Sequence, residues 1–211
     1  MAEKIGFFGG SFDPIHYGHL ILAEQCREQA ELDRVIFVPA SMSPHKLAGP
    51  HATDRQRIEM LRLALSGHTP FEPNDIEIKR DGVSYSVETL EYFAQLFPDA
   101  QLFLLLGSDS LQAFMTWKQP EKICKLTTPL VYERHDSNAS IDILSELVSQ
   151  DRLEEIKQQE IIAPRIEISS SDLRSRIASG RSIRYLTPRP VEKYIETNQI
   201  YMAENSVVKN V

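Results

Sequence analysis

Residues 9–19 read Gly-Gly-Ser-Phe-Asp-Pro-Ile-His-Tyr-Gly-His, and they follow a short, mostly apolar stretch at residues 4–8. This stretch predicts a buried strand that ends at the two glycines. A helix is then expected from about Tyr17, because apolar residues recur near helical spacing at Leu20, Leu22, Ala23 and Cys26. The chain therefore opens with a strand, a glycine-rich turn and a helix.

The alternation of strand and helix continues along the chain. Apolar stretches predict further strands at residues 34–38, 71–78, 102–106, 129–132 and 166–168. Helices are expected at the capping-box sequence Thr53-Asp-Arg-Gln56, after Ser86, around Ile141, Leu144, Leu147 and Val148, and from about Ser171 and Pro190.

These strands are apolar at nearly every position, which is typical of a parallel sheet covered on both faces. We therefore expect a single α/β domain over residues 1–202, built as a doubly wound, Rossmann-like parallel sheet with helices on both faces. Residues 203–211 are expected to form a disordered tail.

Composition excludes several classes of protein. The chain has 211 residues, of which 42% are hydrophobic and 25% are charged, an ordinary globular balance. Its longest apolar run, at residues 102–106, is far shorter than the roughly 20 residues that cross a bilayer. The N-terminus lacks the pattern of a secretory signal, so we expect a cytoplasmic protein with no membrane partner. Cys26 and Cys124 are expected to be reduced core thiols.

The charge is negative overall but unevenly distributed. The net charge of −7 argues against nucleic acid as a partner. Residues 136–160 are acidic, whereas residues 165–193 carry Arg165, Arg174, Arg176, Arg181, Arg184, Arg189 and Lys193. The basic stretch fits a small polyanionic ligand, but from charge alone we favour a solvated, ion-paired face. Arg176, Arg181, Arg184 and Arg189 are interpreted as surface charges.

The ligand site is expected where the strands end, because open parallel sheets bind ligands at the carboxyl ends of their strands. Gly9 and Gly10 let backbone approach a ligand closely, and the N-terminus of the following helix suits a phosphate. His16 and His19 lie three residues apart and face one side of that helix, with Gly18 between them. Two such imidazoles can stabilise a phosphoryl oxygen on which negative charge develops.

Other interpretations of this turn remain open at this point. The turn does not match the G-x-G-x-x-G fingerprint of dinucleotide-binding proteins. An NAD-dependent dehydrogenase is therefore the least favoured of the functions considered. The two histidines could bind a metal ion, but no Asp, Glu or Cys completes a ligand set at nearby spacing, and no protein-held metal is expected. Either histidine could simply be packed. The whole string nevertheless favours nucleotide binding over these alternatives.

The chain resembles the nucleotidyltransferase superfamily with the H-x-G-H signature, and within it the bacterial nicotinate-nucleotide adenylyltransferases. The resemblance covers about residues 5–201. It is carried by residues 9–19 and, in order, by Pro44-His45-Lys46, residues 84–89 (Ser-Tyr-Ser-Val-Glu-Thr), Gly107-Ser108-Asp109 with Trp117, and residues 168–174 (Ile-Ser-Ser-Ser-Asp-Leu-Arg). The order and spacing of these motifs are specific to the enzyme family.

The resemblance implies adenylyl transfer from ATP, with Mg²⁺ as its charge partner, to nicotinate mononucleotide, giving deamido-NAD and pyrophosphate. His16, His19 and Lys46 are then the catalytic residues. Residues implied to bind ATP are Gly9, Gly10, Ser11, Phe12, His16, His19, Gly107, Ser170, Ser171 and Arg174. We expect Ser171 to cap its helix as well, while Ser170 and Arg174 contact phosphate.

The acceptor is implied to contact His45, Lys46, Ser84, Tyr85, Asp109 and Trp117. Trp117 resembles the family residue that stacks on the pyridine ring, although a lone tryptophan is more often packing. Backbone N–H groups at Ser84 and Tyr85 would hold a carboxylate and so favour nicotinate over nicotinamide, although this segment could also be a plain helix entry capped by Ser86. Asp109 could accept a hydrogen bond from a ribose hydroxyl, or it could be an acidic residue in the first turn of a helix.

Two segments depart from the family pattern. Residues 41–43 are Ser-Met-Ser, where a second proline often precedes Pro44, and residues 132–136 are Tyr-Glu-Arg-His-Asp, where Arg-Pro-Gly is common. The part played by Arg134 therefore stays open. Alternative functions are the same chemistry on nicotinamide mononucleotide or another phosphorylated acceptor, and a non-catalytic nucleotide-binding module. A homo-oligomer is also left open.

Overall fold

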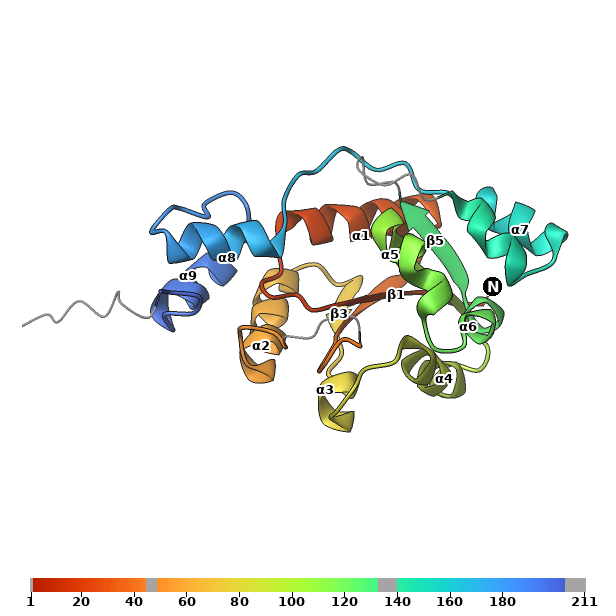
Figure 1. Cartoon of the computed structure of the whole chain (residues 1–211), viewed down its shortest axis with the longest axis horizontal. Helices are drawn as coiled ribbons and strands as arrows, with labels where there is room; N and C mark the ends of the chain where they lie inside the picture. Colours follow the sequence, from red (N-terminus) through yellow and green to blue (C-terminus); the bar gives the residue numbers. More distant parts are fainter. Residues whose placement is uncertain (1, 45–48, 133–139, 204–211) are drawn as a thin grey trace, which may run out of the picture.

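The computed structural model describes residues 2–44, 49–132 and 140–203. Within these ranges, five parallel strands form one sheet in the order β3-β2-β1-β4-β5. The strands are β1 (Lys4–Gly10), β2 (Arg34–Pro39), β3 (Phe71–Pro73), β4 (Gln101–Gly107) and β5 (Thr128–Tyr132). Helices lie on both sides of the sheet, and α8 and α9 form one end of the molecule beside α2 (Figure 1).

The main helices are α1 (Tyr17–Gln29), α2 (Asp54–Leu65), α3 (Ile76–Arg80), α4 (Ser86–Leu96), α5 (Ser108–Ala113), α6 (Pro120–Leu126), α7 (Gln150–Lys157), α8 (Ser170–Ala178) and α9 (Arg189–Thr197). Two short 3₁₀ turns, η1 (Phe114–Thr116) and η2 (Ile141–Glu146), complete the regular elements of the described ranges.

Side chains of the inner strands alternate between two hydrophobic cores. In β1, Ile5 and Phe7 pack into a core with α4 and α6, whereas Phe8 packs into a core with α1 and α2. In β4, Leu104 packs into the core with α4 and α6, and Phe103 packs into the core with α1 and α2. Successive strand residues point to opposite faces, so a strand that is apolar throughout must be covered on both sides. The expected doubly wound, single-domain α/β fold is confirmed.

Several local expectations were wrong. The extended segment predicted at residues 71–78 ends at Pro73, and α3 follows it. The helix expected around Ile141 is a 3₁₀ turn, with α7 after it. Residues 166–168 are not a strand. These segments are short, and apolar periodicity over so few residues does not separate strand from helix or turn.

Two predicted helix caps are displaced by one or two residues. Ser169, not Ser171, is the N-cap of α8, where its hydroxyl accepts a hydrogen bond from Asp172 N–H at 3.1 Å. Tyr85 is the N-cap of α4, so Ser86 is the first helical residue. Serine at any of these neighbouring positions is compatible with a helix start, and tertiary packing selects among them.

The two cysteines are buried and free, as expected. Burial raises the pKa of the Cys26 thiol to about 12 and that of Cys124 to about 11, which keeps both thiols protonated at neutral pH. Across the described ranges, no helix is both long and apolar enough to cross a bilayer.

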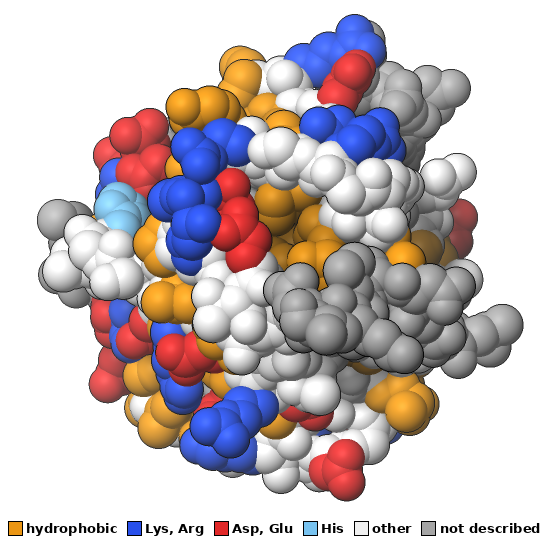
Figure 2. Space-filling model, turned by 90° about the vertical axis from the view of Figure 1, so that its left-hand side faces the viewer, with side chains coloured by type: hydrophobic (Ala, Val, Ile, Leu, Met, Phe, Trp, Pro, Cys, Tyr) orange, Lys and Arg blue, Asp and Glu red, His pale blue; other side chains and the backbone are white. Residues whose placement is uncertain are grey.

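The basic stretch at residues 165–193 is largely ion-paired. Figure 2 looks at the end of the molecule formed by α8 and α9, where Lys and Arg side chains lie in separate groups among acidic ones. The buried carboxylate of Glu192 pairs with Arg184 at 3.1 Å and Arg189 at 2.6 Å, and Arg165 pairs with Glu167. The solvated-face interpretation is therefore the better one for this stretch.

We predict that Thr53→Ala lowers the free energy of unfolding by about 1 kcal/mol. Thr53 Oγ1 accepts from Gln56 N–H at 3.3 Å, and the Gln56 side chain accepts from Thr53 N–H at 2.9 Å, a complete capping box at the start of α2. Urea unfolding followed by circular dichroism measures the change. Ser66→Ala, at the exposed C-terminal end of the same helix, is the control and should change stability by less than about 0.5 kcal/mol.

Candidate active site

In the described part of the chain, two cavities adjoin at the carboxyl end of the sheet. Both are lined by Ser11, Ala40 and Ser43, which follow β1 and β2. The first has a volume of about 360 Å³ and the second about 400 Å³. Each is large enough for part of a nucleotide, since ligand pockets of proteins hold about 300–1,000 Å³.

Aromatic and small residues line the first cavity. Tyr85 and Trp117 contribute aromatic rings, Gly107 is the last residue of β4, and Asp109 lies at the start of α5. The Trp117 ring is held against Phe114, with 5.2 Å between ring centroids. This lining suits a flat heterocycle with a sugar attached.

The mouth of the first cavity also carries an ion pair. Lys118 Nζ lies 4.3 Å above the centroid of the Tyr85 ring and 2.6 Å from a carboxylate oxygen of Glu88. The hydrogen bond to Glu88 raises the pKa of the Lys118 ammonium. Sequence reasoning did not single out Lys118, because an exposed lysine after a tryptophan has no distinctive pattern.

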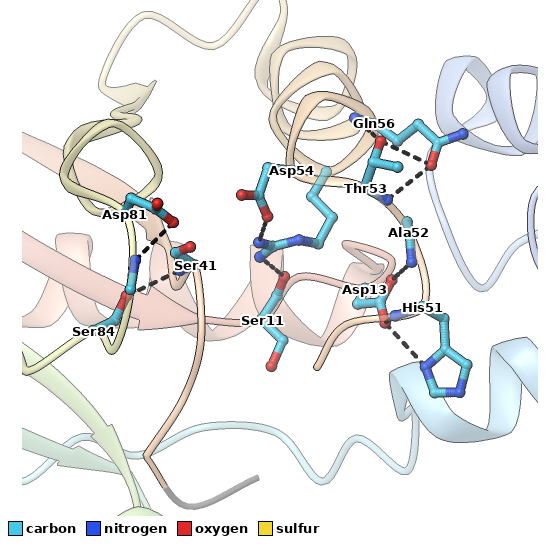
Figure 3. Close-up of polar contacts among 12 residues, drawn as sticks. Ser11, Asp13, Ser41, His51, Ala52, Thr53, Asp54, Gln56, Asp81 and Ser84 are labelled. Atoms are coloured by element: carbon cyan, nitrogen blue, oxygen red, sulfur yellow. Dashed lines mark hydrogen bonds and ion pairs between the residues drawn. The ribbon is translucent and has the colours of Figure 1, made fainter. Parts of the chain in front are cut away.

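The Ser84 amide is engaged within the protein. Ser84 N–H donates to the Met42 carbonyl at 2.8 Å. Ser84 Oγ accepts from Ser41 N–H at 2.9 Å, a contact drawn in Figure 3. The Ser84 N–H is thus occupied by a carbonyl of the protein, and its expected role in holding a ligand carboxylate stays a prediction. The loop instead leads into α4, and the first amides of a helix have no acceptor within it.

Polar groups line the second cavity. His19, Asp13 and the loop residues Ser11 and Phe12 form one wall, and the first turn of α8 forms another with Ser170, Ser171 and Arg174. A histidine, an arginine and several hydroxyls around one space are typical donors to phosphate oxygens. The chain thus brings together segments 9–19 and 169–174, as the sequence predicted.

The two signature histidines have different environments. His19 lines the second cavity, whereas His16 is only 2% exposed. Their rings are stacked with centroids 3.7 Å apart, and His16 N–H donates to His19 Nδ1 at 3.3 Å. Because Nδ1 accepts, the neutral His19 ring carries its proton on Nε2 and presents a donor there.

Gly18 leaves the space that the His16 ring occupies. A Cβ at this position would lie 2.9 Å from His16 Nδ1 and 3.0 Å from His16 Cε1. In the sequence, Gly18 is notable only for its place between the two histidines. In the structure its missing side chain makes room for the imidazole beneath His19.

Side chains from distant segments hold the loop between β1 and α1, residues 11–16, which is called the histidine loop below. The backbone carbonyls of four loop residues accept hydrogen bonds of 2.8–2.9 Å from side chains, in the pairs Ser11–Arg57, Asp13–Arg174, Pro14–Ser170 and Ile15–Thr187. Ser170 and Arg174, expected to contact phosphate, thus also bind the loop itself. Each lines the second cavity as well, so the two roles are compatible.

Sequence reasoning missed Arg57, Asp13, Thr187 and Tyr201. Arg57 is fully buried and pairs with Asp54. Arg57 lies three and four residues before Met60 and Leu61, which are buried, so the three side chains share one face of α2. A charged residue on this apolar face was the signal in the sequence that could have identified Arg57. Asp13 lies inside the signature string but was given no role of its own, and Thr187 and Tyr201 carry no comparable pattern.

Some predicted residues lie outside the described ranges. His45 and Lys46 belong to residues 45–48, and Arg134 belongs to residues 133–139, neither of which is described. The predicted tail is described only at Ala203. The roles assigned to these residues from the sequence stay predictions.

Comparisons with known proteins agree with this geometry. The family model described as cytidylyltransferase-like matches residues 7–176. The chain is similar to the probable nicotinate-nucleotide adenylyltransferase of Rhodopirellula baltica, with 45% identity covering 93% of this chain and 92% of the relative. The protein of the same name from Dictyoglomus turgidum is 40% identical, with 96% and 97% covered.

The chain belongs to the cytidylyltransferase-like family, among its nicotinate-nucleotide adenylyltransferases. A solved structure of this type is the Plasmodium falciparum nicotinic acid mononucleotide adenylyltransferase complexed with NaAD. Its TM-score is 0.73 at 20% identity, with 94% of this chain and 97% of that chain covered. At 20% identity, this structural similarity supports the fold alone. The assignment to the family is based on the family model and on the relatives with 40–45% identity.

We predict that Gly18→Ala lowers kcat/KM by about tenfold or more without destabilising the fold, because the added Cβ displaces the His16 ring that supports His19. Alanine is the better helix former by up to about 1 kcal/mol, so the helix itself should not weaken. Turnover and thermal unfolding measured on one preparation separate the two effects. Wild-type turnover in this variant would show that the His16 position is unimportant.

Proposed function

We propose that the chain joins ATP and nicotinate mononucleotide to give deamido-NAD and pyrophosphate. The observation that carries this proposal is the pair of adjoining cavities, one aromatic and one polar, which meet at Ser11, Ala40 and Ser43. A heterocycle with its ribose fits the first cavity, and phosphates fit the second. The family assignment supports the same reaction.

The chemistry is a direct displacement. An oxygen of the acceptor's 5′-phosphate forms a bond to the α-phosphorus of ATP, and the bond between that phosphorus and the α,β-bridging oxygen breaks. The electron pair of the broken bond leaves with pyrophosphate. Catalysis then consists of orienting the two phosphates and stabilising the charge that moves between them.

His19 is the residue best positioned for charge stabilisation. Its Nε2–H can donate to an α-phosphate oxygen in the second cavity, and the buried His16 ring supports it from below. Direct contact between His16 and phosphate, implied by the resemblance, would require the His16 ring to become more exposed. Gly9 and Gly10 line the first cavity next to Ser11, where the two cavities meet, and let the reacting phosphate of the acceptor approach the backbone there.

Residues of α8 complete the proposed ATP site. Arg174 and Ser171 can donate to phosphate oxygens while Ser170 secures the loop. His45 and Lys46 are proposed to approach from the opposite side. Any Mg²⁺ is proposed to arrive with ATP, because Mg²⁺ on a nucleotide needs only one or two protein ligands. Among the described residues, no three or more His, Cys, Asp or Glu side chains are grouped so that they could hold a metal ion.

The acceptor is proposed to occupy the first cavity. Trp117 stacks on the pyridine ring, and Asp109 accepts from a ribose hydroxyl. A Cβ at Gly107 would lie 2.6 Å from Asp109 Oδ1, so this glycine makes room for the Asp109 carboxylate. Backbone amides at Tyr85 and the first turn of α4 would hold the nicotinate carboxylate in place of the Ser84 N–H. We propose that the reaction takes place in the cytoplasm.

We predict that His19→Ala lowers kcat by about 10²–10³-fold, because it removes one preorganised donor to the developing charge. Pyrophosphate release from ATP and nicotinate mononucleotide measures the loss, and circular dichroism verifies the fold. His68→Ala is a matched control, since His68 is half exposed and pairs with Glu24 at the surface. A near-normal rate in His19→Ala would refute the catalytic role.

We also predict that kcat/KM for nicotinate mononucleotide exceeds that for nicotinamide mononucleotide by at least about tenfold. Hydrogen bonds to a charged acceptor contribute about 1.5–3 kcal/mol, against about 1 kcal/mol for neutral pairs. Parallel assays with the two acceptors give the ratio directly. Equal efficiency would refute carboxylate recognition, and no pyrophosphate with either acceptor would favour a binding module over an enzyme.

A further inference from the structure

Asp13 is a buried carboxylate in the middle of the histidine loop. It is 3% exposed, lines the second cavity and lies between Phe12 and Pro14 in the signature string. A buried charge is costly unless hydrogen bonds compensate it, so its partners indicate what it does.

Three other segments of the chain converge on Asp13. Its Oδ2 accepts from His51 N–H at 2.8 Å, and its Oδ1 accepts from Ala52 N–H at 3.0 Å and from the Tyr201 hydroxyl at 2.7 Å. Arg174 donates to the Asp13 carbonyl at 2.8 Å and lies 3.9 Å from Oδ2. Figure 3 shows His51 and Ala52 beside the carboxylate.

These partners come from different walls of the polar cavity. His51 and Arg174 both line the cavity, with Asp13 between them. His51 precedes α2, and Arg174 belongs to α8. Tyr201 reaches Asp13 from the segment after α9, which is 188 residues away in the sequence. The carboxylate therefore connects the loop before α2, the helix α8 and the C-terminal segment.

The carboxylate is ionised and its lone pairs are largely used. Burial alone would raise the pKa of Asp13, but hydrogen bonds from His51, Tyr201 and Ala52, with the charge of Arg174, outweigh burial and hold the pKa below its usual value. An ionised carboxylate has about four lone-pair sites, and three hydrogen bonds occupy most of them. Such a group is better suited to holding protein than to accepting a substrate proton.

We propose that Asp13 is a positioning residue of the phosphate cavity and that Tyr201 is its outer partner. Together they fix the 49–52 loop, Arg174 and the histidine loop in the arrangement that receives the phosphates of ATP. This inference rests on the proposed function for the identity of the ligand. The C-terminal segment acts on the phosphates only through Asp13.

The test uses Tyr201→Phe, which removes a single hydroxyl and retains the ring. The variant should raise the KM for ATP by about three- to tenfold, because one hydrogen bond to a charged group is lost. The KM for nicotinate mononucleotide should stay within about twofold, since the acceptor occupies the other cavity. Tyr194→Phe is the matched control in α9, a partly buried ring on the same core, and should leave both constants unchanged.

A double-mutant comparison tests whether Tyr201 acts through Asp13. Asp13→Asn directs an amide N–H₂ toward one set of donors and should weaken ATP binding more than Tyr201→Phe does. Adding Tyr201→Phe to Asp13→Asn should then change KM by less than about twofold. Independent, multiplicative effects of the two substitutions would overturn the proposed coupling. If Asp13→Asn fails to fold, the Tyr201→Phe result decides alone.

Calorimetric binding of α,β-methylene-ATP, which cannot undergo the transfer, separates this inference from the proposed function. Weaker binding of the analogue by Tyr201→Phe, with wild-type binding by Tyr194→Phe, supports the positioning role even if no acceptor is turned over. Equal affinity in Tyr201→Phe and wild type, or no binding by wild type, overturns it. A lower unfolding temperature with unchanged affinity would assign the contact to stability alone.

Discussion

The constraint on which the site depends is that the loop between β1 and α1 is buried and must still satisfy its backbone carbonyls. Residues 12–16 are all buried, and they belong to neither a strand nor a helix that could accept or donate in a regular ladder. The Arg57 guanidinium and the Thr187 hydroxyl are among the side chains that fill this need. Loop, helix α2 and the C-terminal third of the chain are therefore interdependent.

Arg174 of α8 contacts both the protein and the polar cavity. Arg174 donates to the Asp13 carbonyl and to Ser171 Oγ, and it also lines the polar cavity. A guanidinium has five N–H groups, so binding the loop leaves donors for a ligand. A side chain that is already fixed by the protein loses little conformational freedom when a phosphate arrives, which favours binding.

The separation of an aromatic cavity from a polar one follows from the sheet order. Strand β1 is central, with β2 on one side and β4 on the other, so the loops after β1 and β4 meet at one end. The segment after β4 carries Asp109, in α5, and Trp117, and the segment after β1 carries His19, in the first turn of α1. Ser11 lies where the two cavities meet. A reaction between two phosphorylated molecules requires such a meeting point.

The fold class, the five strands of the sheet and most of the segments that line the two cavities could be predicted from residue patterns alone. Continuous apolar strands require cover on both faces, and glycine, histidine and serine at strand ends are local signals that depend little on the rest of the chain. The short elements α3 and η2 could not be predicted, because packing rather than apolar periodicity determines their structure. Three contacts became apparent only in the folded chain: the stacking of His16 on His19, the hydrogen bond from the Ser84 amide to Met42, and the hydrogen bond from Tyr201 to Asp13. These outcomes depend on hydrogen-bond partners far apart in the chain, and no spacing along a sequence records which donor will face which acceptor once the sheet has formed.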